Sequence, residues 1–343
     1  MTSHLRSPGI SRGYARFMSA EAARARLRGL TDFAAPWAVS VAATLRLADH
    51  IKGGADRLGE LAERAGADPD ALLRLLRYLV TRGVFAEADG AYANTELSRL
   101  LLDENGWRPW LDLDDAPGIW AESWSSLLDA VRMGSPGRDD GWFYGELDRR
   151  RNAASFDALM AAHVQANAEE VAHKYAWSDV EHVVDVGGGT GVMLRTLLAV
   201  QPHLRGTLFD LPRVVEAAEP AERLEVVGGD LFGDPLPQGD AYILSQVVHG
   251  FPDDGAERVL RLCAEAGSDG APIVLVEGVM SERPTAEEAS FDLFMFTLGG
   301  GRQRTMHELR HLAESAGLVL RSSQPLTTGD SFVELVGSGQ ARG

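Results

Sequence analysis

Cysteine is nearly absent from this sequence, and long apolar segments are missing altogether. Cys263 is the one cysteine among 343 residues, so neither an intramolecular disulfide nor a zinc cage of cysteines can form. This usage favours a reducing compartment, and we predict a soluble cytoplasmic protein. No apolar run reaches the roughly 18 to 20 residues that span a bilayer. These absences argue against a membrane protein and against a disulfide-stapled secreted domain.

Positive charge is also scarce. The formal net charge is -17, from 33 basic and 50 acidic residues, which argues against nucleic acid or an anionic membrane as a partner. The arm formed by residues 1–30 is an exception, with six arginines against the single acid Glu21. It lacks the apolar core of a secretory signal. We interpret it as a tail that runs into a first helix, and an organelle transit peptide is the alternative.

The pattern of apolar residues predicts two domains, 1–180 and 181–343. The first has helical periodicity, whereas the second alternates apolar strands with helices. Strands separated by helices indicate a parallel sheet covered on both faces. The expected strands are 183–186, 206–209, 224–227, 241–244 and 272–276, with a closing pair at 318–320 and 332–336. We therefore predict an α/β, doubly wound domain behind a mainly helical one.

A winged-helix unit is predicted within the first domain. Two helices, one at 58–65 and one that begins at Pro69 behind an Asp68 N-cap, precede a hairpin at 84–93. This arrangement raises the possibility of DNA binding, but acidic residues outnumber basic ones across the unit. A major-groove reader needs a positive surface. A packing or dimerisation module is therefore favoured.

A glycine-rich loop follows the first strand of the second domain. Residues 183–191 read VVDVGGGTG, and glycine is needed where a ligand approaches the backbone without a Cβ in the way. The G-x-G-x-x-G spacing of nicotinamide folds fails, because Val192 and Leu194 stand at the sixth positions. The loop suits a ligand without a pyrophosphate, and Asp185 beside it favours a cationic or amine-bearing one. The alternative is a turn that binds nothing.

Acidic residues end the next two predicted strands. Asp210 lies 23 residues beyond Gly187, where an acid accepts hydrogen bonds from ribose hydroxyls in doubly wound sheets. Asp230 is placed to meet an adenine amino group, with Leu231 and Phe232 packed on the ring. Each aspartate alone is more often a loop or cap residue. Three acids at successive strand ends nevertheless predict a nucleoside site.

These motifs, in this order, resemble the class I S-adenosylmethionine-dependent O-methyltransferases of the plant caffeate and flavonoid type and their bacterial natural-product relatives. The segments that carry the resemblance are VVDVGGGTG, Phe209-Asp210-Leu211-Pro212, GGDLF and Val248-His249-Gly250-Phe251. It covers nearly the whole chain. It implies a Rossmann-like methyltransferase domain behind a winged-helix dimerisation domain, a homodimer, and S-adenosylmethionine as cofactor. The implied cofactor contacts are Gly187, Gly189, Asp210, Leu211, Asp230, Leu231, Ser245 and Gln246.

His249 is the expected general base of such an enzyme. It follows the fourth strand, where open parallel sheets bind ligands, and an imidazole accepts a phenol proton near neutral pH. By the resemblance, Glu277 orients and charge-stabilises this imidazole, and a second acid belongs in the segment 301–305. That segment reads GRQRT here, and Gln303 cannot carry negative charge. Gly250 also replaces the aspartate that commonly follows the histidine.

The acceptor pocket is expected to be mostly apolar and to bind a small aromatic substrate. The residues that the resemblance places beside the acceptor are Phe156, Met160, His163, Phe291 and Met295. They recur at helical spacings, and methionine suits a flat aromatic ring. As bare patterns, such stripes are more often part of the core.

The sequence therefore predicts O-methylation of a phenolic or enolic hydroxyl of an aromatic secondary metabolite. A second interpretation keeps the cofactor but changes the reaction to hydroxylation, decarboxylation or rearrangement, and Gln303 motivates it. A ligand-responsive DNA-binding regulator rests on the winged helix alone. A metal-dependent methyltransferase needs a carboxylate cluster beside the acceptor, and since we identify none, no metal is predicted.

Overall fold

The computed structural model describes residues 19–138 and 141–340, and the chain divides into two compact units, Met1–Leu111 and Asp112–Gly343. The sequence pattern changes near residue 180, but the helices that precede this point from Asp112 onward belong to the same unit as the sheet. They do so because their apolar faces pack on the sheet and on one another. Most of the arginine-rich arm, residues 1–18, lies outside the described residues.

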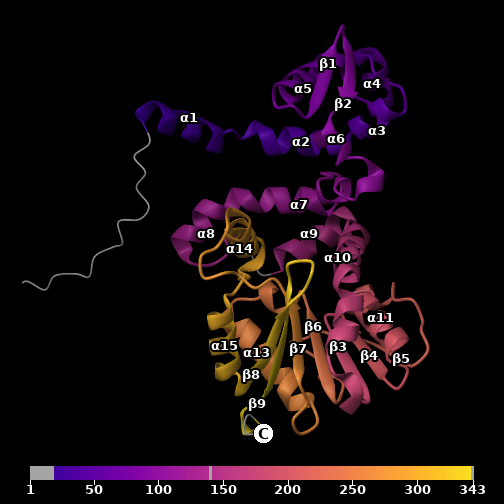
Figure 1. Ribbon diagram of the computed structural model, residues 1–343, viewed down its shortest axis with the longest axis vertical. Helices are drawn as coiled ribbons and strands as arrows, with labels where there is room; N and C mark the ends of the chain where they lie inside the picture. The colour runs from indigo at the N-terminus through magenta and orange to yellow at the C-terminus, as the bar shows by residue number, and fades with distance from the viewer. Residues whose placement is uncertain (1–18, 139–140, 341–343) are drawn as a thin grey trace, which may run out of the picture. The chain divides into compact units, whose positions relative to one another are not determined.

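The first unit is mainly helical, with one short hairpin (Figure 1). Its elements are α1 (Ala20–Leu30), α2 (Ala34–Thr44), α3 (Leu47–Lys52), α4 (Leu58–Ala65), α5 (Pro69–Thr81), β1 (Phe85–Ala88), β2 (Ala91–Asn94), α6 (Glu96–Arg99), and the 3-10 turns η1 (Asp103–Asn105) and η2 (Arg108–Trp110). The Asp68 carboxylate caps α5 by accepting the Ala71 N–H at 2.9 Å. Asp89 and Gly90 both have positive φ, as a tight hairpin turn requires.

Apolar side chains on α1 and α2 remain exposed within the single chain. Phe33, which immediately precedes α2, is 82% exposed, Leu30 76% and Leu27 60%, whereas the core of this unit is formed by residues from α2 to Leu102, such as Ala42, Leu61 and Leu76. Water-exposed aromatic and aliphatic groups of this size, gathered on neighbouring helices, are typical of an interface.

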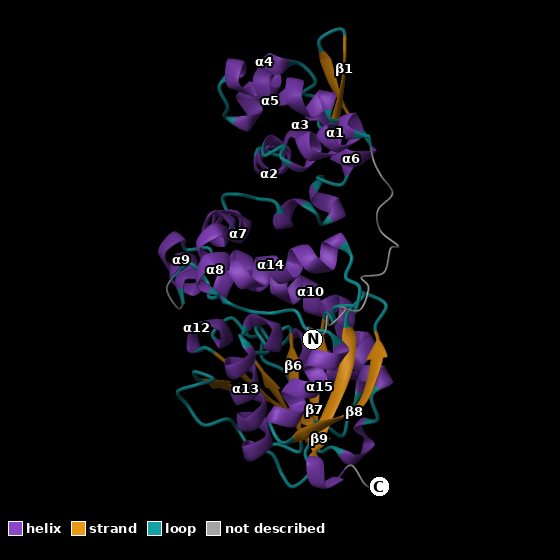
Figure 2. Cartoon of the chain, turned by 90° about the vertical axis from the view of Figure 1, so that its left-hand side faces the viewer, coloured by secondary structure: helices purple, strands orange, loops and turns teal. Residues whose placement is uncertain are grey.

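The second unit is a seven-stranded sheet with helices around it (Figures 1 and 2). Its first half contains α7 (Ala116–Ser123), η3 (Trp124–Ser126), α8 (Leu127–Met133), α9 (Trp142–Arg150), α10 (Ala153–Lys174), η4 (Trp177–Asp179), β3 (His182–Val186), α11 (Val192–Val200), β4 (Arg205–Asp210), α12 (Pro212–Val215) and β5 (Leu224–Gly228). Its second half contains β6 (Ala241–Ser245), η5 (Val248–Gly250), α13 (Asp253–Ala266), β7 (Ile273–Glu277), α14 (Ala286–Gly299), α15 (Met306–Ser315), β8 (Leu318–Pro325), β9 (Ser331–Gly337) and η6 (Ser338–Gln340).

The strand order is β5-β4-β3-β6-β7-β9-β8, and this confirms the predicted doubly wound α/β fold. The first five strands are parallel, and β9 lies antiparallel between β7 and β8. All seven predicted strands are present. The strand order reverses between β3 and β6, and in open sheets of this kind the ligand crevice lies at that point, beyond the carboxyl ends of the strands.

Alternate residues of the central strands face different helical layers. Val184 and Val186 pack toward α13 and α15, whereas Val183 packs toward α10 and α11. A third group of helices, α7, α8, α9 and α14, lies across one end of the strands (Figure 2). Helix α14 in this group contacts η5, which follows β6. Among the helices of residues 19–138 and 141–340, none is long and apolar enough to cross a bilayer.

Candidate active site

The glycine loop between β3 and α11 leaves open space beside the backbone of Gly189. Gly187, Gly189 and Gly191 all have positive φ, which glycine adopts without steric cost. A Cβ on Gly187 would lie 2.8 Å from the Val247 side chain, whereas a Cβ on Gly189 would meet no atom within 4 Å. Gly189 is therefore the position at which a ligand can approach the backbone.

Asp185 lies fully buried beneath this loop. A Cβ on Gly188 would come within 2.5 Å of its carboxylate. Burial first, and then the charge of Asp210, raise the pKa of Asp185 to about 7. The N–H of Leu194 offsets part of this effect without forming a hydrogen bond of ordinary geometry. A cation above the loop would favour the ionised carboxylate.

Asp210 ends β4 and ties the glycine loop to the neighbouring strand. Its Oδ2 accepts the Gly189 N–H at 2.8 Å and its Oδ1 accepts the Leu211 N–H at 2.7 Å. Burial raises the pKa of Asp210, and these two donors and Arg213 oppose the increase. Since each carboxylate oxygen has a second lone pair, both can still accept a hydroxyl.

Asp230 follows β5 at the edge of the sheet. Its side chain is exposed, and its Oδ1 accepts the Phe232 N–H at 2.8 Å. Leu231 and Phe232 are partly buried against the core, and the Phe232 ring contacts Phe251 edge-on with centroids 5.3 Å apart. A carboxylate and two apolar side chains therefore lie side by side at this edge of the sheet, and their contact with an adenine ring stays a prediction.

Ser245 is the last residue of β6, and Gln246 follows it. The Ser245 hydroxyl is buried and has no hydrogen-bond partner among the described residues. Gln246 has φ +59, and its Nε2 donates to the Val276 carbonyl at 3.3 Å and to Asp330 at 3.0 Å. Ser245 therefore remains available to a ligand, while the Gln246 amide is held toward β7 and Asp330.

Glu277 shapes the turn that carries His249, and does not contact its ring. Glu277 Oε1 accepts the backbone N–H groups of Val247, Val248 and His249. Three donors on one oxygen cap η5 and fix the direction of the chain there. Burial nevertheless raises the pKa of Glu277 to about 7, opposed by these N–H groups and by Arg304.

The segment 301–305 packs against the same turn. A Cβ on Gly301 would lie 2.4 Å from the His249 carbonyl oxygen. The buried Arg304 guanidinium donates to the carbonyl groups of Val248, at 3.1 Å, and Phe251, at 3.0 Å. Gln303 is buried beside them, and its Oε1 has no hydrogen-bond partner in the part of the chain that the structure describes.

Asp330, between β8 and β9, is a site residue that the sequence interpretation missed. Its Oδ2 accepts hydrogen bonds from Asn167 Nδ2 at 2.6 Å and Gln246 Nε2 at 3.0 Å, and lies 3.3 Å from His163 Nε2. Asn167 and His163 are one turn apart on α10. No local pattern marks Asp330, because a Gly-Asp pair in a hairpin loop is an ordinary turn.

The imidazole of His249 is buried among groups of both charges. Its Nδ1 has no hydrogen-bond partner among the described residues, and its ring meets Phe291 edge-on with centroids 5.5 Å apart. Burial lowers the pKa of His249 to about 4, the charge of Asp330 opposes this, and the charges of His163 and Arg304 add to it. The imidazole is therefore neutral, and able to accept a proton, across the physiological pH range.

Aromatic side chains from α7, α9, α10 and α14 form one group that reaches His249 through Phe291. Phe291 and Met295 lie on α14, and Phe156 and Met160 on α10. The Phe156 ring contacts Trp120 and Phe143, with centroids 6.4 and 5.1 Å apart. The further aromatic residues of this group, which the sequence did not single out for the acceptor, are Phe143, Tyr144 and Phe294. Trp120, on α7, contacts both Phe156 and Phe294, and so links α10 to α14.

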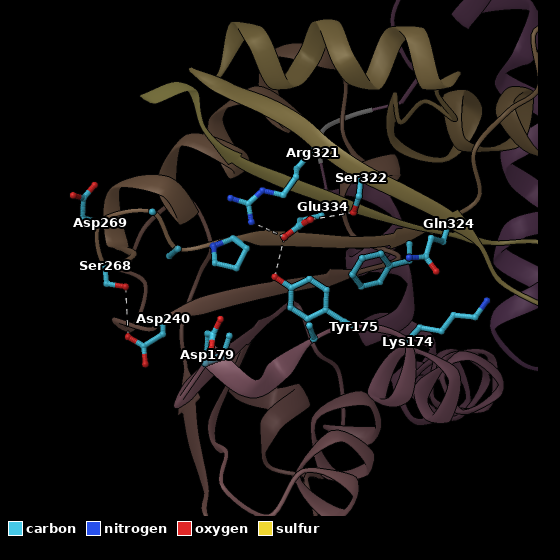
Figure 3. A pocket seen from close by; sticks show the side chains of 16 residues that line it. Lys174, Tyr175, Asp179, Asp240, Ser268, Asp269, Arg321, Ser322, Gln324 and Glu334 are labelled. Carbon is cyan, nitrogen blue, oxygen red and sulfur yellow. Dashed lines mark hydrogen bonds and ion pairs between the residues drawn. The ribbon is translucent and has the colours of Figure 1, made fainter. Parts of the chain in front are cut away.

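A hollow lies at the opposite end of the strands, away from these residues. It encloses about 560 Å³ and is lined by Tyr175, Arg321 and Glu334 among others (Figure 3). Glu334 accepts hydrogen bonds from Tyr175 Oη at 3.0 Å, Ser322 Oγ at 3.0 Å and Arg321 at 3.2 Å. Because these polar groups satisfy one another, we interpret this hollow as structural.

The residues at the carboxyl ends of the strands fit S-adenosylmethionine. Gly189 leaves room at the backbone, the Ser245 hydroxyl is buried without a partner, and the carboxylates of Asp185 and Asp210 suit a cationic nucleoside. Among the described residues, no group of three or more histidine, cysteine, aspartate or glutamate side chains is arranged to hold a metal ion.

The fold defines a Rossmann-like α/β protein whose candidate ligand site lies at the switch point of the sheet. The model of the O-methyltransferase domain matches residues 124–319, and that of the O-methyltransferase dimerisation domain matches residues 27–104. The chain belongs to this O-methyltransferase family.

Individual relatives agree with this assignment. The 2,7-dihydroxy-5-methyl-1-naphthoate 7-O-methyltransferase of Streptomyces carzinostaticus is 40% identical, over 93% of this chain and 98% of the relative. Aclacinomycin 10-hydroxylase of Streptomyces purpurascens is also 40% identical, over 87% of this chain and 85% of the relative. The crystal structure of an O-methyltransferase from neocarzinostatin biosynthesis, with S-adenosylmethionine and 2-hydroxy-5-methyl naphthoic acid, has a TM-score of 0.84 and 39% identity, covering 91% of this chain and 98% of that one.

Proposed function

We propose that this chain is an S-adenosylmethionine-dependent O-methyltransferase that methylates a phenolic or enolic hydroxyl of an aromatic natural product. The observation that carries the proposal is the place of His249. Its neutral, buried imidazole stands on the turn after β6, at the switch-point end of the sheet, and meets the ring of Phe291. The contact with Phe291 and the position after β6 support a role for His249 as proton acceptor beside an aromatic substrate.

The cofactor would be held by residues of four strand ends. Asp210 would accept the ribose hydroxyls, and Asp230 the adenine amino group, with Leu211, Leu231 and Phe232 packed on the rings. Gly187, Gly189, Asp185 and Ser245 would hold the remaining polar and cationic parts. When bound, S-adenosylmethionine supplies a methyl group on an already activated sulfonium. The protein then has to align the acceptor oxygen and remove its proton.

His249 would remove that proton. A phenol placed against Phe291 and Met295 would give its proton to the imidazole while its oxygen takes the methyl group. The methyl–sulfur bond would break at the same time, and the leaving group would be the neutral thioether of the cofactor. Glu277 acts through the backbone, because its Oε1 holds the three N–H groups of the turn and so fixes where the imidazole stands. Gln246 serves in the same way, through its hydrogen bond to Asp330.

Mass spectrometry would test this proposal directly. The purified protein is incubated with methyl-labelled S-adenosylmethionine and a panel of simple and polycyclic phenols, hydroxynaphthoates included. We expect one labelled methyl group in the product of at least one acceptor. Tight cofactor binding by calorimetry with no labelled product across the panel would count against methyl transfer.

A second candidate, altered chemistry on the same cofactor site, is favoured by two observations. Gln303 is neutral where the family pattern has an acid, and aclacinomycin 10-hydroxylase is among the relatives that are 40% identical. In that case the cofactor would serve as a bound charge, and the substrate would change without gaining the label. The same labelling experiment separates the two candidates.

We also propose a homodimer in the cytoplasm. The match of residues 27–104 to a dimerisation domain supports the dimer, as do the exposed apolar side chains of α1 and α2. The single cysteine supports a reducing compartment. Fractionation of the producing cells with an antibody against the chain would test the location.

A further inference from the structure

We infer that Asp330 is a positioning residue of this site, and that its carboxylate supplies the negative charge that the segment 301–305 lacks at Gln303. The role of Asp330 in catalysis rests on the proposed methyl transfer. Its hydrogen bonds to neighbouring side chains are independent of that proposal. Asp330 would act through His249 and His163, and would not touch the reacting atoms.

The position of Asp330 is fixed from several directions. It stands 9% exposed in the loop between β8 and β9, and its carbonyl accepts the Leu326 N–H at 2.8 Å. One carboxylate oxygen, Oδ2, holds the side chains of Asn167, Gln246 and His163. This single group therefore joins α10 to the turn that follows β6, which are the two elements that bear the two histidines.

Asp330 is the carboxylate that stays ionised in this cluster. Its burial is outweighed by the hydrogen bond and charge of His163, the Asn167 amide and the charge of His249, which together lower the pKa of Asp330. Burial of Glu277, in contrast, raises its pKa to about 7, and its Oε1 is occupied by backbone N–H groups. At neutral pH Asp330 is therefore ionised, whereas Glu277 is about half protonated.

Gln303 and Asp330 approach the same spot from distant parts of the chain. A Cβ built on Gly278 would lie 2.7 Å from Gln303 Nε2 and 3.6 Å from Asp330 Oδ1. A carboxylate at position 303 would place a second negative charge close to the first one, which is costly in a buried site. The neutral amide of Gln303 therefore avoids charge repulsion with the Asp330 carboxylate.

The groups around His249 have opposing effects on its protonated form. His163 on α10 and Arg304 beside α15 disfavour a positive imidazole, and Asp330 favours it. Arg304 is itself paired with Asp253 at 2.8 Å. Glu277, on β7, accepts the backbone N–H groups of the same turn. When His249 takes a proton, Asp330 is consequently the group that stabilises the new charge.

The first test reads the histidine directly and does not require turnover. In protein with ring-labelled histidine, the His249 resonance is assigned as the one that His249→Gln removes. With a pKa of about 4, about a quarter of this imidazole is protonated at pH 4.5. We expect the protonated fraction to fall at least threefold in Asp330→Asn. An unchanged fraction in a folded Asp330→Asn protein would overturn the inference.

Glu334→Gln is the matched control for this test. Glu334 lies four residues away on β9, is equally buried, and also accepts three hydrogen bonds, but it faces the hollow at the other end of the sheet. We expect its replacement to leave the His249 resonance unchanged. An equal response in both variants would identify a general loss of structure and contradict a role specific to Asp330.

The second test exchanges the charge between the two positions. We expect Asp330→Asn to reduce kcat at least tenfold with little change in cofactor Kd, and to move the acidic midpoint of the kcat/KM profile to lower pH. Gln303→Glu should reduce activity in the wild-type background, yet restore at least a third of it in the Asp330→Asn background.

If both single variants fold and Gln303→Glu does not restore activity to Asp330→Asn, the proposal that the two positions share one negative charge is wrong. If Asp330→Asn does not fold, the double variant and Gln303→Glu still decide the question, because an active double variant requires that the two positions share one charge. Absence of labelled product from the wild-type protein would defeat the proposed methyl transfer, while the resonance measurement would still report on Asp330.

Discussion

Glu277 holds the turn after β6 through three backbone hydrogen bonds, and its burial disfavours the ionised carboxylate. Burial raises its pKa from the ordinary value of 4.5 to about 7. Between these values the folded state keeps a proton that the unfolded state releases, so its contribution to stability is full below pH 4.5 and is lost as the pH rises through 7. A difference of this size corresponds to an upper limit on the order of 3 kcal/mol.

We therefore expect Glu277→Gln to weaken the decline in unfolding free energy between pH 5 and pH 8. Urea unfolding followed by tryptophan fluorescence at the two pH values measures this, with the exposed Glu265→Gln as control. Asp185 also lowers the unfolding free energy as the pH rises over this range, because its pKa is raised to about 7 as well. Identical pH dependence in the wild type and Glu277→Gln would mean that the carboxyl is not buried as described.

His249→Gln should reduce turnover by roughly 10² to 10⁴-fold, the usual contribution of a general base. Cofactor affinity should remain within about twofold, because no cofactor residue is changed. Initial rates with labelled S-adenosylmethionine and calorimetry of cofactor binding measure the two effects separately. His173→Gln, on the exposed side of α10, serves as the control. Wild-type turnover in His249→Gln would exclude this residue as the base.

Single residues were predictable from the sequence where a motif fixes the neighbouring backbone. Asp210 and Gly189 follow from the strand-loop-helix order, and the structure joins them by a hydrogen bond of 2.8 Å. Asp330 was not predictable, because its partners Asn167 and Gln246 are 163 and 84 residues away. The contact of Glu277 with the backbone of the turn, in place of the imidazole, also depends on tertiary packing.

At the scale of elements, the glycine loop offers a matched pair of substitutions. Gly189 and Gly66 share φ +61, and an added Cβ meets nothing within 4 Å at either position. Each change to alanine should therefore cost about 1 kcal/mol of stability through the left-handed backbone alone. Gly66 follows α4 in the first unit, which contains none of the predicted cofactor residues.

We expect only Gly189→Ala to lose S-adenosylmethionine affinity, by at least tenfold, because its methyl group would occupy the space above the loop. Thermal unfolding and calorimetry of both variants measure stability and affinity. Equal cofactor Kd values for Gly189→Ala and Gly66→Ala would show that the ligand does not approach this backbone.

The strands were predictable as elements because their apolar runs are short and lie between helical stretches. The expected segment 206–209 lies within β4 (Arg205–Asp210), and 241–244 lies within β6 (Ala241–Ser245). The helices at 112–180 were also recognised as helical, but their membership in the unit of the sheet was not. Periodicity marks the buried face of a helix, but it does not identify what that face packs against.

At the scale of the whole molecule, the exposed apolar residues of α1 and α2 are expected to hold the dimer together. Phe33→Asp places a charge on a side chain that is 82% exposed in the single chain, so it should leave the fold of the unit intact and cost affinity between copies. Light scattering coupled to gel filtration should give 37.0 kDa for this variant and twice that mass for the wild type.

Val226→Asp, on edge strand β5 and 40% exposed, is the corresponding control and should remain dimeric. If Phe33→Asp stays a dimer at micromolar concentration, the interface lies on another face of the first unit.

The place of β9 in the sheet determines when the site can form during translation. Helices and strands up to β7 emerge first, and β8 follows, but β8 has no strand to pair with until β9 is inserted between them. Asp330 immediately precedes β9. A nascent chain halted before residue 330 would carry His249 and the glycine loop without the carboxylate that joins α10 to the turn after β6. Translation must therefore run through the last strand before the site is complete, and we expect chains that end before residue 330 to be inactive.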